Sequence, residues 1–135
     1  MLLEIVTPEK KVYSEQVESV VLPTVEGEVG ILPGHIPLLT MLDLGELQVA
    51  AKGKVESLAV DKGFAQVYGD KVSVLTEAAI NVEEIDLSEV EKAQERAEKA
   101  LEEAEKEGMD PAEIEQLENL VRFSLQQKLL KRKRK

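Results

Sequence analysis

Short apolar runs separated by turn residues occupy the first 82 positions of the chain. Runs such as VESLAV, FAQVY and KVSVLT are rich in β-branched residues and are divided by segments that contain Gly and Asp. Four glycines lie 6 to 10 residues apart, which is the spacing of successive antiparallel hairpins: Gly45, Gly53, Gly63 and Gly69. Glycine supplies the positive φ that such turns need. We therefore predict an antiparallel β-sandwich over residues 1–82.

Alternation within these runs indicates which side chains form the core. In KVSVLT, the side chains of Val72, Val74 and Thr76 share one face of the strand. Other runs, such as SVVLPT at 19–24, are apolar on both faces, which predicts a thin core between two sheets. Pro23 lacks an amide hydrogen and should end a strand or mark an edge.

The period becomes helical in residues 83–135. Asp86 and Glu89 fit a capping box, in which the first side chain accepts from backbone amides and the second reaches back to the cap. Glu107-Gly108 should end this helix. Its apolar face is made almost entirely of small residues: Val90, Ala93, Ala97, Ala100 and Ala104.

A second helix should begin at Asp110-Pro111, with the acid as N-cap and the proline at the first helical position. Its apolar side carries Ile114, Leu117, Val121 and Leu125. Two helices joined by so short a connection form an antiparallel αα-hairpin. Because a buried alanine contributes far less than the ~1.5–3 kcal/mol of a buried leucine, this hairpin should be marginally stable and able to open.

Composition excludes several functional classes. The 135 residues include no Cys and one His, so disulfides, thiol chemistry and multi-histidine zinc sites are excluded. Aromatic residues make up 3%, too few for a base-stacking surface, and the net charge of −10 repels nucleic acid. No apolar run approaches the ~20 residues that span a bilayer, and the first ten residues lack the pattern of a leader, so we expect no direct bilayer insertion.

A longer motif carries a family resemblance. The stretch Gly27–Leu47, GEVGILPGHIPLLTMLDLGEL, resembles the signature segment of the epsilon subunit of F-type ATP synthases. The similarity extends over the whole chain, since EIVTPEKKVYSEQVESVVLPTVEGE is similar to the opening strands of that family and the helical hairpin matches its C-terminal domain in place and length.

The resemblance implies a non-catalytic subunit of the central stalk, at the cytoplasmic face of the bacterial cell membrane. In that family the β-sandwich binds the gamma subunit and sits on the ring of c subunits, and it helps to couple proton or sodium flow to rotation. The C-terminal helices fold against the sandwich or extend along gamma toward the alpha and beta subunits of the catalytic head. The extended form restrains ATP hydrolysis.

Two residues of the signature segment become candidate contacts through this resemblance. His35 is expected on the surface that meets gamma, and a hydrogen bond that merely stabilises its loop is the competing interpretation. Glu28 is expected on the loop that faces the rotor ring, with a solvated carboxylate as the alternative. No nucleophile or acid–base partner accompanies the histidine, so we assign it no catalytic role.

Some bacterial members of the family carry a nucleotide-sensing motif at the start of the first helix. Ile85 and Asp86 match it, but its Arg-Ala pair is replaced by Glu89-Val90. Arg96 and Arg122 stand where two further arginines would be, and Gln126 replaces a third. A glutamate repels a phosphate, so we expect ATP to bind weakly as a regulatory ligand, if at all. No other cofactor and no metal is implied, and the capping role of Asp86 is favoured.

Charge is strongly segregated in the helical part. Residues 83–118 hold fifteen acidic and four basic residues, whereas 128–135 hold six basic and no acidic residues. The six cations are Lys128, Lys131, Arg132, Lys133, Arg134 and Lys135. They complement the dipole at the end of a helix, and they could dock on an acidic surface. The resemblance supplies one, the acidic lever region of the beta subunits, and Arg122 is a further candidate contact with a partner.

Two rival functional classes remain open from the residues alone. A β-barrel enzyme would need an acid–base pair, a phosphate loop or a metal set, and the sequence shows none. A β-sandwich scaffold or adaptor with a coiled-coil-like arm fits the patterns if the signature segment is set aside.

Overall fold

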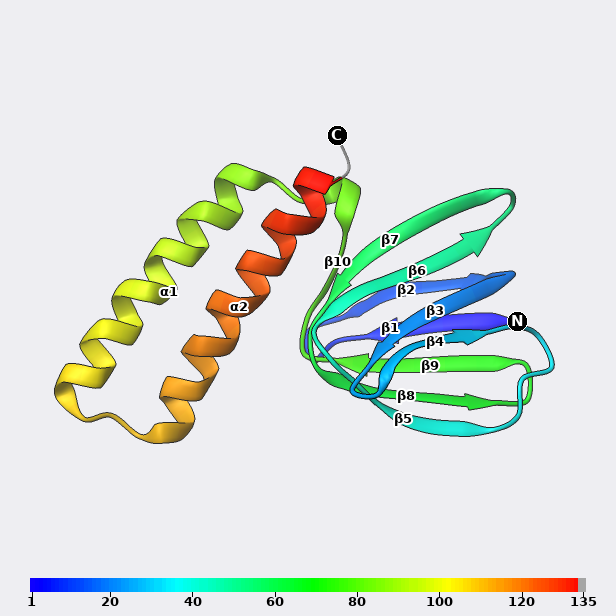
Figure 1. Cartoon of the computed structure of the whole chain (residues 1–135), viewed down its shortest axis with the longest axis horizontal. Helices are drawn as coiled ribbons and strands as arrows, with labels where there is room; N and C mark the ends of the chain where they lie inside the picture. The colour runs from blue at the N-terminus through cyan, green and yellow to red at the C-terminus, as the bar shows by residue number, and fades with distance from the viewer. Residues whose placement is uncertain (134–135) are drawn as a thin grey trace. The chain divides into compact units, whose positions relative to one another are not determined.

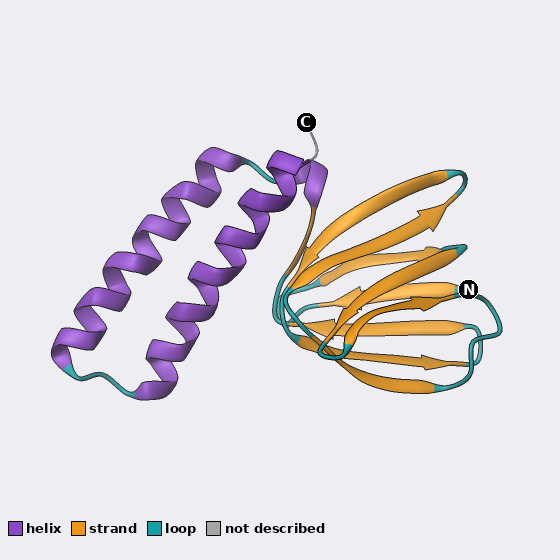
Figure 2. Cartoon of the chain, in the orientation of Figure 1, coloured by secondary structure: helices purple, strands orange, loops and turns teal. Residues whose placement is uncertain are grey.

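A computed structural model of the chain describes residues 1–133, so Arg134 and Lys135 lie outside the described residues. Backbone contacts divide the chain into two compact units, Met1–Glu83 and the part from Glu84 onward. The first unit contains all ten strands and the second contains both α-helices (Figures 1 and 2). A β-sandwich followed by a helical hairpin, as predicted from the sequence, is confirmed.

The strands form one continuous sheet that consists of two halves. The first half-sheet has the order β10 (Ala79–Asn81), β7 (Lys54–Val60), β6 (Gly45–Ala51), β3 (Ser19–Thr24) and β4 (Gly27–Ile31). The second has the order β5 (Leu38–Leu42), β8 (Gly63–Tyr68), β9 (Lys71–Thr76), β1 (Leu2–Val6) and β2 (Lys11–Gln16). One pair, Thr24 with Leu42, joins the halves. The pairing is antiparallel except between β1 and β9, which run parallel.

The core lies between the two halves and follows the predicted alternation. On β9, Val72, Val74 and Thr76 are buried, whereas Leu75 is exposed. Burying a leucine, isoleucine or valine contributes about 1.5–3 kcal/mol, so this core stabilises the first unit by itself. Its largest fully buried members are Leu3, Ile5, Leu22, Ile31, Leu42, Leu47 and Leu58.

The four spaced glycines serve two different purposes. Gly53 and Gly69 occupy tight turns with φ of 76° and 56°, as predicted. The prediction of a positive φ is wrong for Gly45 and Gly63, which begin β6 and β8. There the missing side chain allows close packing, because a Cβ on Gly63 would lie 1.9 Å from the carbonyl oxygen of Leu75.

Pro23 lies one residue before the end of β3, where the strand changes partner. Residues 19–21 pair with β6, and Thr24 pairs with β5. The proline therefore occupies the gap between two ladders, where its missing amide hydrogen costs no hydrogen bond.

The second unit is an antiparallel pair of helices. After the 3-10 turn η1 (Val82–Glu84), the chain forms α1 (Leu87–Glu107) and α2 (Pro111–Lys133). Gly108 ends α1 in the left-handed conformation with φ of 65°. The Asp110 carboxylate accepts from the amide of Ala112 at 2.9 Å, which starts α2 as predicted.

Small residues line the seam between the helices, but the register of α2 differs from the prediction. Ala97 and Ala104 are buried on α1, whereas Ala93 is exposed. On α2 the buried positions are Phe123, Ser124 and Leu130, whereas Leu125 is 44% exposed. An α-helix has 3.6 residues per turn, so one face advances by alternating steps of three and four residues. A step of three from Val121 reaches Ser124, whereas the predicted step of four reaches Leu125.

Candidate partner-binding surfaces

The signature segment forms β4, a tight turn and β5. In Leu32-Pro33-Gly34-His35 the His35 amide donates to the Leu32 carbonyl at 3.1 Å, and Gly34 has φ of 86°. Proline followed by a glycine with positive φ is the pattern of a type II turn. The turn holds two large apolar side chains in the solvent, Leu32 at 63% and Ile36 at 75% exposure.

The imidazole of His35 contributes to the structure of this loop. Its Nδ1 lies 2.6 Å from the carbonyl oxygen of Ile36. Because a carbonyl oxygen can only accept, Nδ1 donates and Nε2 is left as the free acceptor of the neutral ring. The loop-stabilising hydrogen bond considered from the sequence is therefore present, and it also fixes the direction of the ring.

Glu28 lies in a strand, so its predicted place on a loop is wrong. It is the second residue of β4 and is the exposed partner of Pro23 on β3. The turn between β3 and β4 is short, because the hydroxyl of Thr24 donates to the Gly27 carbonyl at 2.6 Å and accepts from the Glu26 amide at 3.2 Å. Glu28 and the turn that contains His35 consequently lie toward opposite ends of β4.

An apolar row crosses the outer face of the second half-sheet. Its members are cross-strand neighbours on four successive strands: Met41, Phe64, Leu75 and Val6. The first three are 53%, 52% and 58% exposed. Val6, Phe64 and Leu75 also line one shallow hollow with Thr7 and Pro8. The sequence does not reveal this surface, because only strand pairing brings its members together.

A charged cluster lies beside the apolar row. The Glu4 carboxylate pairs with the ammonium groups of Lys71 at 2.5 Å and Lys11 at 3.0 Å. These hydrogen bonds, that with Lys71 first, lower the pKa of Glu4. The apolar row thus has a polar border, as protein-binding patches commonly do.

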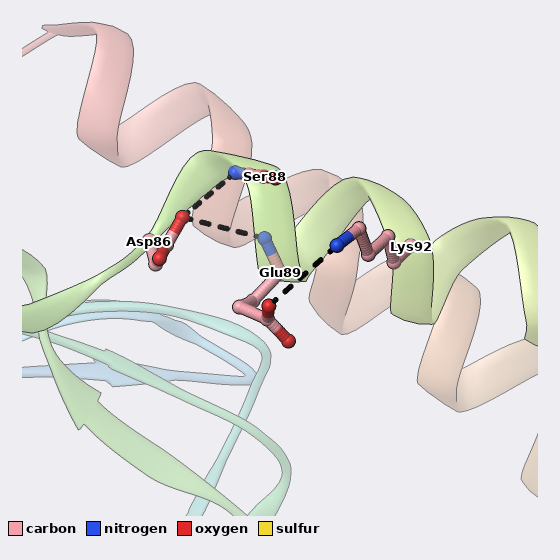
Figure 3. Close-up of polar contacts among 4 residues, drawn as sticks. All are labelled: Asp86, Ser88, Glu89 and Lys92. Carbon is pink, nitrogen blue, oxygen red and sulfur yellow. Dashed lines mark hydrogen bonds and ion pairs between the residues drawn. The ribbon is translucent and has the colours of Figure 1, made fainter.

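The residues at the start of α1 are mainly structural. The Asp86 carboxylate accepts from the amides of Ser88 at 2.9 Å and Glu89 at 3.3 Å, so it caps the helix as predicted (Figure 3). The second half of the predicted capping box is not formed, because the Glu89 carboxylate pairs with Lys92 at 3.9 Å instead (Figure 3). Ile85 is 3% exposed.

The two candidate arginines occupy different surroundings. Arg96 borders a hollow between the helices, whose floor includes Ala97, Leu117 and Ser124. The guanidinium of Arg122 is exposed and pairs with Glu118 at 3.4 Å on its own helix. Arg122 does not line the hollow that Arg96 borders.

The basic end of α2 lies against the beginning of α1. Lys128 donates to the side-chain carbonyl of Gln94 at 3.0 Å, and Arg132 lies 4.0 Å from the carboxylate of Glu91. Lys131 and Lys133 also have polar interactions. Both helices of residues 1–133 are too polar to cross a bilayer.

Comparison with known proteins agrees with these features. The family model of the β-sandwich domain of the ATP synthase delta/epsilon chain matches residues 1–82. The chain is 52% identical to the ATP synthase epsilon chain of Carboxydothermus hydrogenoformans over 99 residues, which cover 73% of this chain and 74% of that one. It is 48% identical over 99 residues to the epsilon chain of Pelotomaculum thermopropionicum, with the same coverage, 73% and 74%.

Solved structures give the same relationship. A chain in the cryo-EM structure of the Euglena gracilis mitochondrial ATP synthase, which contains F1 and the c-ring, is similar with a TM-score of 0.68 and 28% identity, over 96% of this chain and 79% of that one. A chain from the Tetrahymena thermophila central stalk and c-ring shares the fold at a TM-score of 0.55 and 16% identity, over 62% of this chain and 68% of that one. The chain therefore belongs to the epsilon chains of F-type ATP synthases, the non-catalytic central-stalk subunits of that rotary complex.

Proposed function

We propose that this subunit divides its work between its two units. The sandwich binds the gamma subunit and the c-ring and so helps to couple ion-driven rotation to ATP synthesis. The helical hairpin restrains ATP hydrolysis by reaching the catalytic head. In a bacterial cell this places the subunit at the cytoplasmic face of the membrane, as a peripheral part of the synthase. Membership of the epsilon family and the surfaces described above support each part.

The apolar row is the observation that supports gamma binding most directly. Met41, Phe64 and Leu75 are more than half exposed, although all three lie in regular strands. Burying such a side chain completely contributes about 1.5–3 kcal/mol, so covering the exposed half of one contributes roughly 1 kcal/mol. Three neighbouring side chains and the hollow beside them form the centre of an interface, and the Glu4 cluster forms its rim.

The signature segment offers two further contacts. The Pro33-Gly34 turn presents Leu32 and Ile36 rigidly, and the free Nε2 of His35 can accept a hydrogen bond from gamma. Glu28, at the other end of β4, is the candidate contact with the c-ring. Because the two residues lie toward opposite ends of one strand, a rigid sandwich can hold both partners at once.

The hairpin carries the proposed regulatory role. Alanine supplies two of the three buried positions of α1. The polar contacts that close the open end of the hairpin, Lys128 with Gln94 and Arg132 with Glu91, are weak. Exposed ion pairs contribute about 0–1 kcal/mol each. Lys128 and Arg132 can therefore exchange these contacts for acidic groups of the beta subunits, and the other four cations of the tail would add to the attraction.

Nucleotide is at most a weak ligand of this hairpin. The Asp86 carboxylate is occupied by two backbone amides, and Arg122 is paired with Glu118. Glu89 would repel a phosphate placed at the start of α1. Isothermal titration with ATP is therefore expected to give no low-micromolar affinity, and Glu89→Arg should strengthen any binding that is present.

Two matched substitutions on opposite half-sheets test the gamma-binding surface. Phe64→Ser removes the centre of the apolar row, whereas Val55→Ser removes an equally prominent side chain, 61% exposed, from β7. In pull-down assays with purified gamma, Phe64→Ser should weaken binding at least about tenfold, as expected when an interface centre is lost. Val55→Ser should bind normally. Equal binding by the two variants would refute this assignment of the surface.

A further inference from the structure

The chain leaves the sandwich through a very short edge strand. β10 has three residues and pairs only with β7, where Asn81 is opposite Leu58. The next three residues form η1, and the boundary between the two compact units falls within that turn, between Glu83 and Glu84. Asn81 is therefore the last paired residue before the connection to the helices begins.

The carboxamide of Asn81 uses both of its ends at this point. Its Oδ1 accepts from the backbone amide of Glu83 at 2.9 Å, which closes the first turn of η1. Its Nδ2 donates to the carboxylate of Glu56 on β7 at 3.3 Å. One bond thus bends the chain out of the strand, and the other ties the bend to the neighbouring strand.

The register explains why the strand does not continue. If antiparallel pairing extended beyond Asn81 and Leu58, Glu83 would lie directly opposite Glu56. Like charges that face each other across a ladder are destabilising. Because the chain leaves the strand at Asn81, Glu56 accepts a hydrogen bond from the Asn81 side chain and does not face Glu83. Both effects favour ending β10 at Asn81.

The surroundings of Glu56 support a defined position for its carboxylate. Glu56 is half-buried on the sheet. The hydroxyl of Tyr13 is buried, and burial, followed by the nearby charges of Glu56 and Glu15, raises the pKa of Tyr13 to about 12. The carboxylate that holds Asn81 is therefore partly shielded from solvent and lies near the buried hydroxyl of Tyr13.

We propose that the Asn81–Glu56 hydrogen bond is a hinge clamp that sets the direction in which the connection to the hairpin leaves the sandwich. Asn81 is a positioning residue: it acts on the balance between hairpin orientations and touches no partner itself. The consequence for ATP hydrolysis rests on the proposed regulatory function, but the clamp is a property of the isolated chain.

The clamp can be tested by distance measurements between spin labels on the full-length chain. The chain has no Cys, so cysteines placed at the exposed positions Gln66 and Lys99 carry the only labels. Asn81→Asp keeps the acceptor for the Glu83 amide but sets a carboxylate against Glu56. It should shift the ratio of hairpin orientations about two- to tenfold, the size expected for one side-chain hydrogen bond.

A second substitution and a control separate the clamp from a general loss of structure. Glu56→Gln added to Asn81→Asp restores a donor and an acceptor, and it should return the distance distribution to that of the native chain. Asn119→Asp makes the same chemical change on the surface of α2, and it should leave the distribution unchanged. If Asn81→Asp prevents folding, Glu56→Ala should produce the same shift, because it removes only the partner on β7.

An unchanged distribution in both Asn81→Asp and Glu56→Ala would overturn the clamp. So would a shift that Glu56→Gln fails to reverse. Because no partner subunit is present in this measurement, its result is independent of gamma binding, and failure to bind gamma would contradict the proposed function without affecting the clamp.

Discussion

Gly63→Ala should unfold the sandwich at a much lower temperature, although it adds one methyl group. The new Cβ would lie 1.9 Å from the carbonyl oxygen of Leu75, 2.8 Å from its carbonyl carbon and 2.8 Å from the Cα of Thr76. All three are backbone atoms of β9, so no side-chain rotation relieves the overlap. β8 and β9 must separate, and this opens the ladder that carries Phe64 and Leu75 of the apolar row.

The size of the effect follows from the displaced backbone. Overpacking costs about 1–3 kcal/mol, and each backbone hydrogen bond lost from the ladder costs about 1 kcal/mol more. A total of about 3 kcal/mol lowers the melting temperature of a unit of this size by roughly 12–24 °C, at about 4–8 °C per kcal/mol.

Two other glycines provide controls. A Cβ on Gly30 would have no atom within 4 Å, and its φ is not positive, so Gly30→Ala should be neutral or stabilise the sandwich by up to about 1 kcal/mol. A Cβ on Gly45 would lie 2.9 Å from the Cβ of Pro23, a side-chain contact, which predicts an intermediate loss. Thermal unfolding followed by circular dichroism ranks the three variants. Melting of Gly63→Ala within a few degrees of the native chain would refute the reasoning.

Three further predictions concern a buried hydroxyl, a helix cap and the basic end. Tyr13→Phe should not lower stability at neutral pH, because the Tyr13 hydroxyl has no hydrogen-bond partner among residues 1–133. Burial and nearby carboxylates raise the pKa of Tyr13 to about 12, so this tyrosine ionises at a lower pH in the unfolded chain than in the native chain. The native chain should therefore lose stability as the pH rises from about 10 to 12. Urea unfolding at each pH should show a smaller loss of stability in Tyr13→Phe. Asp86→Ala removes the cap of α1 and should cost the hairpin about 1 kcal/mol, seen as faster amide exchange in its first turn; unchanged exchange would contradict the capping role. Replacing residues 131–135 with Gln should raise the rate of ATP hydrolysis by the assembled complex, and the subunit should stay bound. An unchanged rate would mean that these cations only increase solubility.

Local features of the fold were predictable because they depend on residues close in sequence. Asp86 caps α1, Gly108 ends it, and Pro111 begins α2, since each uses backbone groups within a few positions. The parallel pairing of β1 with β9 was not predictable, because alternation identifies strands but carries no information about their partners. The two roles of glycine also look alike in sequence: Gly53 provides a positive φ, and Gly63 provides room for a neighbouring strand.

The candidate surfaces divide in the same way. The place of His35 in a loop was expected from the sequence. The apolar row was missed because Phe64 and Leu75 occupy strands whose other face is core, so an apolar residue on the outer face raised no signal by itself. Only pairing brings the row together, and pairing partners such as Met41 and Phe64 lie far apart in the chain. The hydrogen bond between Asn81 and Glu56 is invisible in the sequence for the same reason.

The division of labour between the sandwich and the hairpin is tested most directly by truncation after Glu83. The shortened chain keeps the whole β-sheet and its core, so it should bind gamma as tightly as the full-length subunit. The measurement is the ATP hydrolysis rate of a catalytic head assembled with each form, after each complex is shown to contain the subunit. We predict faster hydrolysis with the truncated chain than with the full-length chain. Equal rates, or loss of gamma binding on truncation, would contradict the account.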